Sequence, residues 1–345
     1  MAFAEEKLLF VSLLIFPLIA MVSSRGPIYT PPTVPSWTNR FNRVSISQGY
    51  SEFFGHSNIR ILNNGSDADL ILDKTSGKYL RKSSFRIDQL NLALKVCFTC
   101  SDIENCSGSG LISRNKYDYG FFSAAMKLPS GFTSGVVIAF YLSNADLYPH
   151  NHDEIDIELL GHEKRREWVM QTNIYGNGSV QTGREEKIYL WFDPTQQFHQ
   201  YSILWNNHHI VFLVDNVPVR EFVHNSASSS VYPSKPMSVF ATIWDASDWA
   251  THGGKYAVNY QYAPFVASFA EMEMEGCVWN PKASAASCPR SSGLSSLDPI
   301  EGQEFVKLSQ EQINGLEWAR GKLMYYSYCK DESRYKVLPP ECKPN

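Results

Sequence analysis

The chain has 345 residues, with 31 Lys and Arg against 35 Asp and Glu, for a net charge of −4. This balance excludes a strongly basic nucleic-acid-binding protein, so nucleic acid is not an expected partner. Hydrophobic residues make up 43% and charged residues 19%, which excludes a disordered chain. The 8 Trp, 18 Tyr and 20 Phe favour a β-rich fold with an aromatic-lined surface.

The N-terminal segment indicates secretion. Residues 8–22 are almost wholly apolar and are followed by the small Ser23 and Ser24. This pattern predicts a signal peptide over residues 1–24, because a membrane span needs about 20 apolar residues. A retained plasma-membrane anchor formed by residues 8–22 is the alternative. Residues 25–43 are proline-rich and predict an extended linker.

Residues 44–275 carry short β-type runs separated by Gly, Pro and Asn turns, with no long helical periodicity. Many short strands in one large domain predict an all-β, two-sheet sandwich or jelly roll. The clearest predicted strands are Val136–Leu142, Ile155–Leu160, Trp168–Asn173, Lys187–Phe192, Tyr201–Trp205, Ile210–Val214 and Met237–Trp244.

Residues 276–345 form a predicted C-terminal extension rather than a separate domain. Its first part, residues 280–303, is rich in Ser, Pro and Gly and predicts a loop. Ser309 and Gln312 have the spacing of a capping box, and the apolar pattern that follows predicts one helix to about Tyr326.

Seven cysteines indicate an oxidising compartment, and four of them lie in the last quarter of the chain. Their spacings suggest the bridges Cys277–Cys288 and Cys329–Cys342, although three pairings are possible. Asn64 and Asn177 begin glycosylation sequons and are the predicted glycan sites.

The segment from His152 to Gly161 carries the chemistry. Acids and aliphatic residues alternate in it, so a strand would place Glu154, Asp156 and Glu158 on one face and the aliphatic side chains on the other. Three like charges repel one another, which raises at least one pKa and suggests a functional reason for the cluster. Two carboxylates that differ in protonation state can cleave a glycosidic bond.

Two other interpretations of this segment remain open. A solvent-exposed edge strand could carry the acids without a function, or the ExDxE spacing could supply oxygen ligands to calcium or another metal. The glycine and spaced carboxylates of an EF-hand loop are absent, so the sequence predicts no metal site and no cofactor.

The segment HDEIDIELLG closely resembles the HDEIDFEFLG signature of plant xyloglucan endotransglucosylase/hydrolases, in glycoside hydrolase family 16. Apart from one insertion, the resemblance covers residues 44–343. Further segments resemble blocks of that family in the same order: Gln171-Thr172-Asn173, Gly183-Arg184-Glu185, Trp191-Phe192-Asp193-Pro194, Trp244-Asp245, Asp248-Trp249-Ala250-Thr251, Gly253-Gly254-Lys255 and Pro339-Pro340-Glu341-Cys342.

The resemblance implies a concanavalin-like β-jelly roll whose concave face holds a glucan chain. It implies that Glu154 is the nucleophile, that Glu158 is the acid/base, and that Asp156 orients and tunes Glu154. The implied reaction cleaves the β-1,4-glucan backbone of xyloglucan with retention and transfers it to another xyloglucan chain. The donor and the acceptor would then both be xyloglucan, and the enzyme would act as a monomer in the cell wall.

The resemblance also implies a set of substrate contacts: Tyr141, Gln171, Thr172, Asn173, Gly183, Arg184, Glu185, Trp244, Asp248, Trp249 and Gly253. Ordinary packing is the alternative for Tyr141 and Trp244, and a buried hydrogen-bonded pair is the alternative for Gln171 and Asn173. A non-catalytic glycan-binding jelly roll is the alternative for the whole chain.

Departures from the family pattern leave the balance of activities open. The loop Ile174–Gly183 is longer than in many transglucosylases and resembles the longer loop of family hydrolases, so xyloglucan or β-glucan hydrolysis is the alternative reaction. Glu332 replaces an Arg that is frequent in the tail of the family, although Arg334 is close.

Residues 78–108 interrupt the family pattern, and their removal restores it. Their removal also takes away Cys97, Cys100 and Cys106 and leaves four cysteines that can pair. The residues at both boundaries can be encoded by typical intron ends. The segment is therefore predicted to be a retained intron, with a genuine surface loop as the alternative.

Overall fold

The computed structural model describes residues 29–76, 107–164, 167–283, 285–287 and 300–343. The predicted signal peptide, Cys288 and nearly all of the predicted insertion lie outside the described residues. No helix within the described ranges is long and apolar enough to cross a bilayer.

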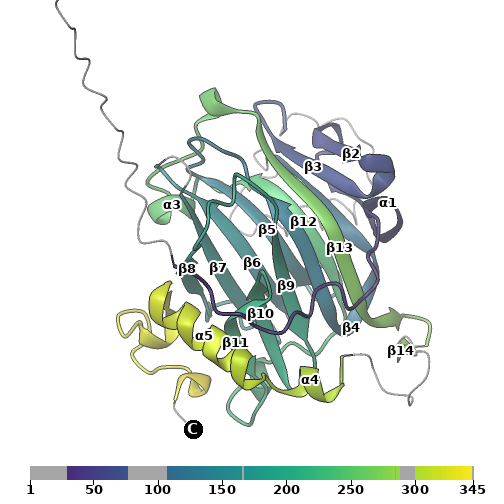
Figure 1. Ribbon diagram of the computed structural model, residues 1–345, viewed down its shortest axis with the longest axis vertical. Helices are drawn as coiled ribbons and strands as arrows, with labels where there is room; N and C mark the ends of the chain where they lie inside the picture. The colour runs from purple at the N-terminus through teal and green to yellow at the C-terminus, as the bar shows by residue number, and fades with distance from the viewer. Residues whose placement is uncertain (1–28, 77–106, 165–166, 284, 288–299, 344–345) are drawn as a thin grey trace, which may run out of the picture.

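The strands form two packed layers (Figure 1). In hydrogen-bonding order, the first layer contains β1 (Tyr50–Phe54), the first half of β4 (Gly108–Lys127), β12 (Met237–Asp245), β5 (Val136–Ser143), β6 (Glu154–Gly161), β7 (Trp168–Tyr175), β8 (Glu186–Tyr189) and β15 (Met324–Ser327). The second layer contains β2 (Ile59–Leu62), β3 (Asp67–Leu72), β13 (Phe265–Asn280), the second half of β4, β9 (His199–Trp205), β10 (His209–Val214) and β11 (Val217–Val223), with β14 (Ala285–Ser287) on the end of β13.

The long strand β4 joins the two layers. Its first half pairs with β12, and its second half pairs with β13 and β9. At the passage, Tyr119 has a φ of 70° and Gly120 follows it. A Cβ on Gly120 would lie 2.7 Å from the carbonyl oxygen of Glu275, so a larger residue would force the neighbouring strand away.

The main hydrophobic core lies between the layers. Ile155, Ile157 and Leu159 of β6 are fully buried there, in one cluster with side chains of β9, β10 and β13. Within the described residues the strand pairs are antiparallel, and each layer turns one apolar face toward the other. The all-β, two-sheet prediction is confirmed.

A second apolar cluster lies on the outer face of the second layer. Leu204 and Val211 pack there against Phe305 of α4 (Gln303–Val306) and the buried Trp37. The backbone amide of Trp37 donates to Asn216 Oδ1 at 2.9 Å. Part of the predicted linker therefore lies against the sandwich.

The C-terminal extension differs in part from its prediction. The capping box at Ser309 is present and begins α5 (Gln310–Lys322), which lies beside β11 in Figure 1. The prediction that the helix continues to Tyr326 is wrong, because Met324–Ser327 forms β15 and pairs with β8. Pairing supplies hydrogen bonds to an edge that would otherwise be open.

A disulfide closes the end of the C-terminal extension. Cys329 and Cys342 form a disulfide with a Cα–Cα distance of 5.2 Å, as predicted. Cys277 is also disulfide-bonded, while its predicted partner lies outside the described residues. Two further α-helices in the described residues are short: α1 (Ile46–Gly49) leads into β1, and α3 (Ala250–Gly253) follows β12.

Candidate active site

β6 is an inner strand of the first layer, between β5 and β7, so the edge-strand interpretation is wrong. Because successive side chains of a strand point to opposite faces, burial of Ile155 and Ile157 in the core turns the acids to the other face. The pairs across β6 are Ser143 and Tyr175 beside Glu154, Tyr141 and Asn173 beside Asp156, and Ala139 and Gln171 beside Glu158.

The three acids lie on the floor of a cleft, a cavity of about 540 Å³ on the outward face of the first layer. Strands β5, β7, β8 and β12 contribute its walls, and the C-terminal extension closes one side. The residues that line it besides the acids are Ala139, Tyr141, Ser143, Ala145, His152, Gln171, Asn173, Tyr175, Val180, Glu185, Lys187, Thr242, Trp244, Trp249, Tyr326 and Arg334.

Glu158 is held at one end of the trio. Its Oε2 accepts a hydrogen bond of 2.5 Å from Gln171 Nε2. Burial raises the pKa of Glu158 to about 7, against the lowering effects of Gln171 and of the Lys187 ammonium. A carboxyl group with this pKa can give up and recover a proton near neutral pH.

Glu154 occupies the other end. Burial raises its pKa to about 7, the Ser143 hydroxyl opposes this shift, and the charge of Glu158 adds to it. The Nε2 atom of His152 lies 4.0 Å from Glu154 Oε2. Between the two, burial and then the charges of Glu154 and Glu158 raise the pKa of Asp156 well above its ordinary value. The trio therefore shares protons instead of carrying three full charges.

Six of the predicted substrate contacts line the cleft: Tyr141, Gln171, Asn173, Glu185, Trp244 and Trp249. Tyr141 stacks on Phe240 at 4.8 Å and is buried, so it is part of the wall. The half-buried rings of Trp244 and Trp249 lie 5.9 Å apart. Such a pair can stack on sugar rings, since aromatic faces accept apolar contacts.

Thr172 is not in the cleft. It follows Gln171 on β7 and therefore faces the opposite side of the layer, where its hydroxyl accepts a hydrogen bond of 3.0 Å from Arg220 Nη1. The motif Gln171-Thr172-Asn173 thus contains two cleft residues and one packing residue.

Four other predicted contacts also lie outside the lining of the cleft: Gly183, Arg184, Asp248 and Gly253. Arg184 is buried in an ion pair of 2.6 Å with Glu341 and holds the extension. The Gly183 carbonyl accepts from the Tyr335 hydroxyl at 2.6 Å, which is a second link to the same segment.

Several lining residues were not predicted from the sequence, among them Tyr175, Lys187 and Tyr326. The alternation of β7 places Tyr175 on the face of Asn173, so extending that strand by two residues would have found it. Arg334, noted only as close to a family position, donates from Nη1 to Glu185 Oε2 at 2.6 Å. Its placement requires the folded extension.

Residues 51–262 match the model of glycosyl hydrolases family 16. The chain belongs to this family. Residues 297–342 match a second model, described as the xyloglucan endo-transglycosylase C-terminus. The family 16 match therefore covers most of the sandwich except β13, and the second match covers the C-terminal extension.

Similar plant proteins span most of the chain. An Arabidopsis thaliana protein described as probable xyloglucan endotransglucosylase/hydrolase protein 28 is 44% identical over 88% of this chain and 80% of its own length. A second Arabidopsis thaliana protein, described as probable xyloglucan endotransglucosylase/hydrolase protein 30, is 49% identical over 70% of this chain and 69% of its own length. A β-1,3-1,4-glucanase structure from a mouse hindgut metagenome is 22% identical over 66% of this chain and 92% of its own, with a TM-score of 0.46.

Proposed function

We propose that this family 16 enzyme cleaves the β-1,4-glucan backbone of xyloglucan with retention and transfers the cleaved chain to another xyloglucan chain. The observation that carries the proposal is the trio of acids on β6, turned into an aromatic-walled cleft. The names of the plant relatives and the match of the extension support xyloglucan as both donor and acceptor.

In the proposed reaction, Glu154 attacks the anomeric carbon while Glu158 protonates the departing glycosidic oxygen. A covalent glycosyl-enzyme forms. Glu158, now ionised, removes a proton from the incoming sugar hydroxyl, and the new glycosidic bond releases Glu154. Water in place of the sugar gives hydrolysis.

Asp156 positions Glu154 in this scheme. Its pKa lies well above its ordinary value, so its carboxyl group binds a proton more readily than an ordinary aspartate and can then donate a hydrogen bond. A neutral Asp156 removes one charge from the trio and allows Glu154 to stay ionised. The raised pKa values of Glu154 and Glu158 place the active protonation state, one acid and one base, near neutral pH.

The proposed setting is the plant cell wall. Its supports are the predicted signal peptide, the disulfides and the relatives. The Asn64 and Asn177 side chains are exposed, which leaves room for the predicted glycans. We expect a monomer, which joins a membrane only if residues 8–22 are retained.

The proposal is tested by incubating the secreted protein with xyloglucan and a labelled xyloglucan oligosaccharide. Label that moves into polymer shows transfer. Shorter polymer with new reducing ends and no incorporated label shows that hydrolysis is the reaction instead. Binding without either result would leave a non-catalytic glycan-binding protein and overturn the proposal.

The same assay on Glu154→Ala tests the assigned nucleophile, and we expect no measurable turnover. The matched control is Glu317→Ala, which removes an exposed carboxylate of α5 and should retain full activity. Turnover by Glu154→Ala comparable to the control would assign the nucleophile elsewhere.

A further inference from the structure

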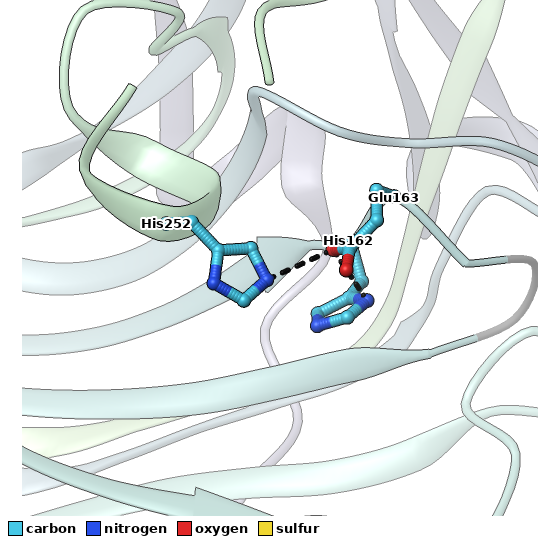
Figure 2. Close-up of side chains that lie close together, drawn as sticks. All are labelled: His162, Glu163 and His252. Carbon is cyan, nitrogen blue, oxygen red and sulfur yellow. Dashed lines mark hydrogen bonds and ion pairs between the residues drawn. The ribbon is translucent and has the colours of Figure 1, made fainter. Parts of the chain in front are cut away.

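A cluster of metal-ligating side chains lies outside the cleft, where the end of β6 meets α3. His162 and Glu163 follow β6, and His252 belongs to α3 (Figure 2). Glu163 Oε2 lies 2.8 Å from His162 Nδ1 and 3.0 Å from His252 Nε2. Figure 2 shows both rings turned toward this carboxylate, and one ligand atom from each of the three residues lies within 4.8 Å of the others.

The donor set selects the class of ion. Two imidazole nitrogens with one carboxylate oxygen are ligands of zinc and similar transition metals, whereas calcium and magnesium prefer oxygen alone. Ligands at about 2.1 Å in a tetrahedron lie about 3.4 Å apart, so small side-chain rotations bring the three atoms into place. Glu167 lies outside this group of three, with its Oε2 3.3 Å from His162 Nδ1.

Hydrogen bonds of the Thr251 side chain hold the two ligand-bearing segments together. The Thr251 hydroxyl, next to His252, donates to the Gly161 carbonyl at 2.7 Å and accepts from the Gly135 amide at 2.8 Å. Gly161 precedes His162, so this bond joins the residues directly beside the two histidines. An ion would meet ligands that are already close, which lowers the ordering cost of binding.

We propose that His162, Glu163 and His252 bind a divalent transition-metal ion of the zinc class. The sequence predicted no metal site, and His252 lies about 90 positions after His162 and Glu163. The ion would link the end of the acid-bearing strand to the segment that carries Trp249, a wall of the cleft. It takes no part in the chemistry of Glu154 and Glu158.

The test uses the untagged, full-length secreted protein after removal of metal with a chelator. Calorimetric titration with ZnCl₂ should give a saturable site, and Zn²⁺ should raise the thermal midpoint, because a ligand that prefers the folded state stabilises it. Co²⁺ in place of Zn²⁺ should give visible absorption bands of a low-symmetry nitrogen and oxygen site. Ca²⁺ and Mg²⁺ should give neither binding nor stabilisation.

Variants identify the ligands. His252→Gln alters an exposed side chain and should weaken Zn²⁺ binding by about 10-fold or more. The matched control is His208→Gln, because His208 also pairs with a glutamate, Glu301 at 3.0 Å, but belongs to no such cluster among the described residues. Equal Zn²⁺ isotherms for the wild type and His252→Gln would overturn the proposal. Binding of Ca²⁺ to the wild type as tightly as Zn²⁺ would also overturn it. No polysaccharide is used, so the result is independent of the proposed reaction.

Discussion

The half-buried Glu158 and the buried Glu186 lie on opposite faces of one sheet, and their surroundings differ in charge. In the cleft, Glu158 shares its face with Glu154 and Asp156, and burial raises all three pKa values. On the other face, burial would also raise the pKa of Glu186, but Arg220, Arg320 and the Ser327 hydroxyl hold it below its ordinary value.

The two faces show that burial alone does not decide the charge of a carboxylate. Arg320 contributes two hydrogen bonds to Glu186, of 2.6 and 3.0 Å, and Ser327 contributes a third of 2.9 Å. This compensated group connects β8 to the extension. The acids of the cleft have fewer positive neighbours, so their repulsion lowers stability while it keeps protons available for catalysis.

The largest expected effect of a single substitution is a loss of stability at Glu186, whose charge the neighbouring arginines compensate. Glu186→Gln leaves Arg220 and Arg320 without their shared carboxylate, and breaking a buried ion pair costs about 3–5 kcal/mol. Urea unfolding should show a loss of that size in the free energy of unfolding. We expect the loss to begin with separation of the extension from β8.

An exposed pair is the control for Glu186→Gln. Glu304 and Arg40 lie 3.4 Å apart with side chains about half exposed, so Glu304→Gln should cost about 1 kcal/mol or less. If the two variants lose equal stability, the group around Glu186 does not hold the extension.

The acids of the cleft should give the stability a pH dependence opposite in sign to that of Glu186. The folded-state pKa values of Glu154 and Glu158 are raised from 4.5 to about 7, so the folded protein binds more protons than the unfolded chain between these values. The free energy of unfolding should therefore fall as pH rises from about 4.5 to about 7, by up to about 3 kcal/mol for each of the two groups, since one pKa unit corresponds to about 1.4 kcal/mol. Urea unfolding at a series of pH values measures the slope.

Asp156→Asn sharpens this test. The amide cannot ionise, so the variant should lose part of the pH slope and gain stability at pH 7 relative to the wild type, while its turnover falls. Glu186 acts with the opposite sign, because its lowered pKa adds stability that disappears as pH falls below about 4.5. A steeper decline of stability for Asp156→Asn would contradict the assigned repulsion.

Local patterns predicted much of the first layer. Alternation along β6 predicted that the acids face away from Ile155 and Ile157. No knowledge of the neighbouring strands was needed, because the period of a strand is a property of its backbone. The capping box at Ser309 predicted the start of α5 for the same reason. Both features depend on residues a few positions apart.

Features that depend on distant residues were missed. The strand predicted as Lys187–Phe192 ends at Tyr189, and Phe192 stacks on the His199 ring at 3.4 Å. The Glu185–Arg334 pair and the surroundings of Glu186 require the extension to be folded against β8. The family resemblance named Thr172 as a contact, although alternation along β7 turns it away from the face of Gln171 and Asn173.

The smallest expected effect is a shift in the pH profile of the reaction. Lys187 lies in the cleft and lowers the pKa of Glu158, so Lys187→Met should raise that pKa while it keeps the length of the side chain. The basic limb of the pH–rate profile, where the acid loses its proton, should move to higher pH by roughly one unit or less. Lys322→Met, on the exposed side of α5, should leave the limb in place. A shift of the limb to lower pH in Lys187→Met would show that Glu158 is not the group that titrates there, and would remove the contrast between the two faces of the sheet.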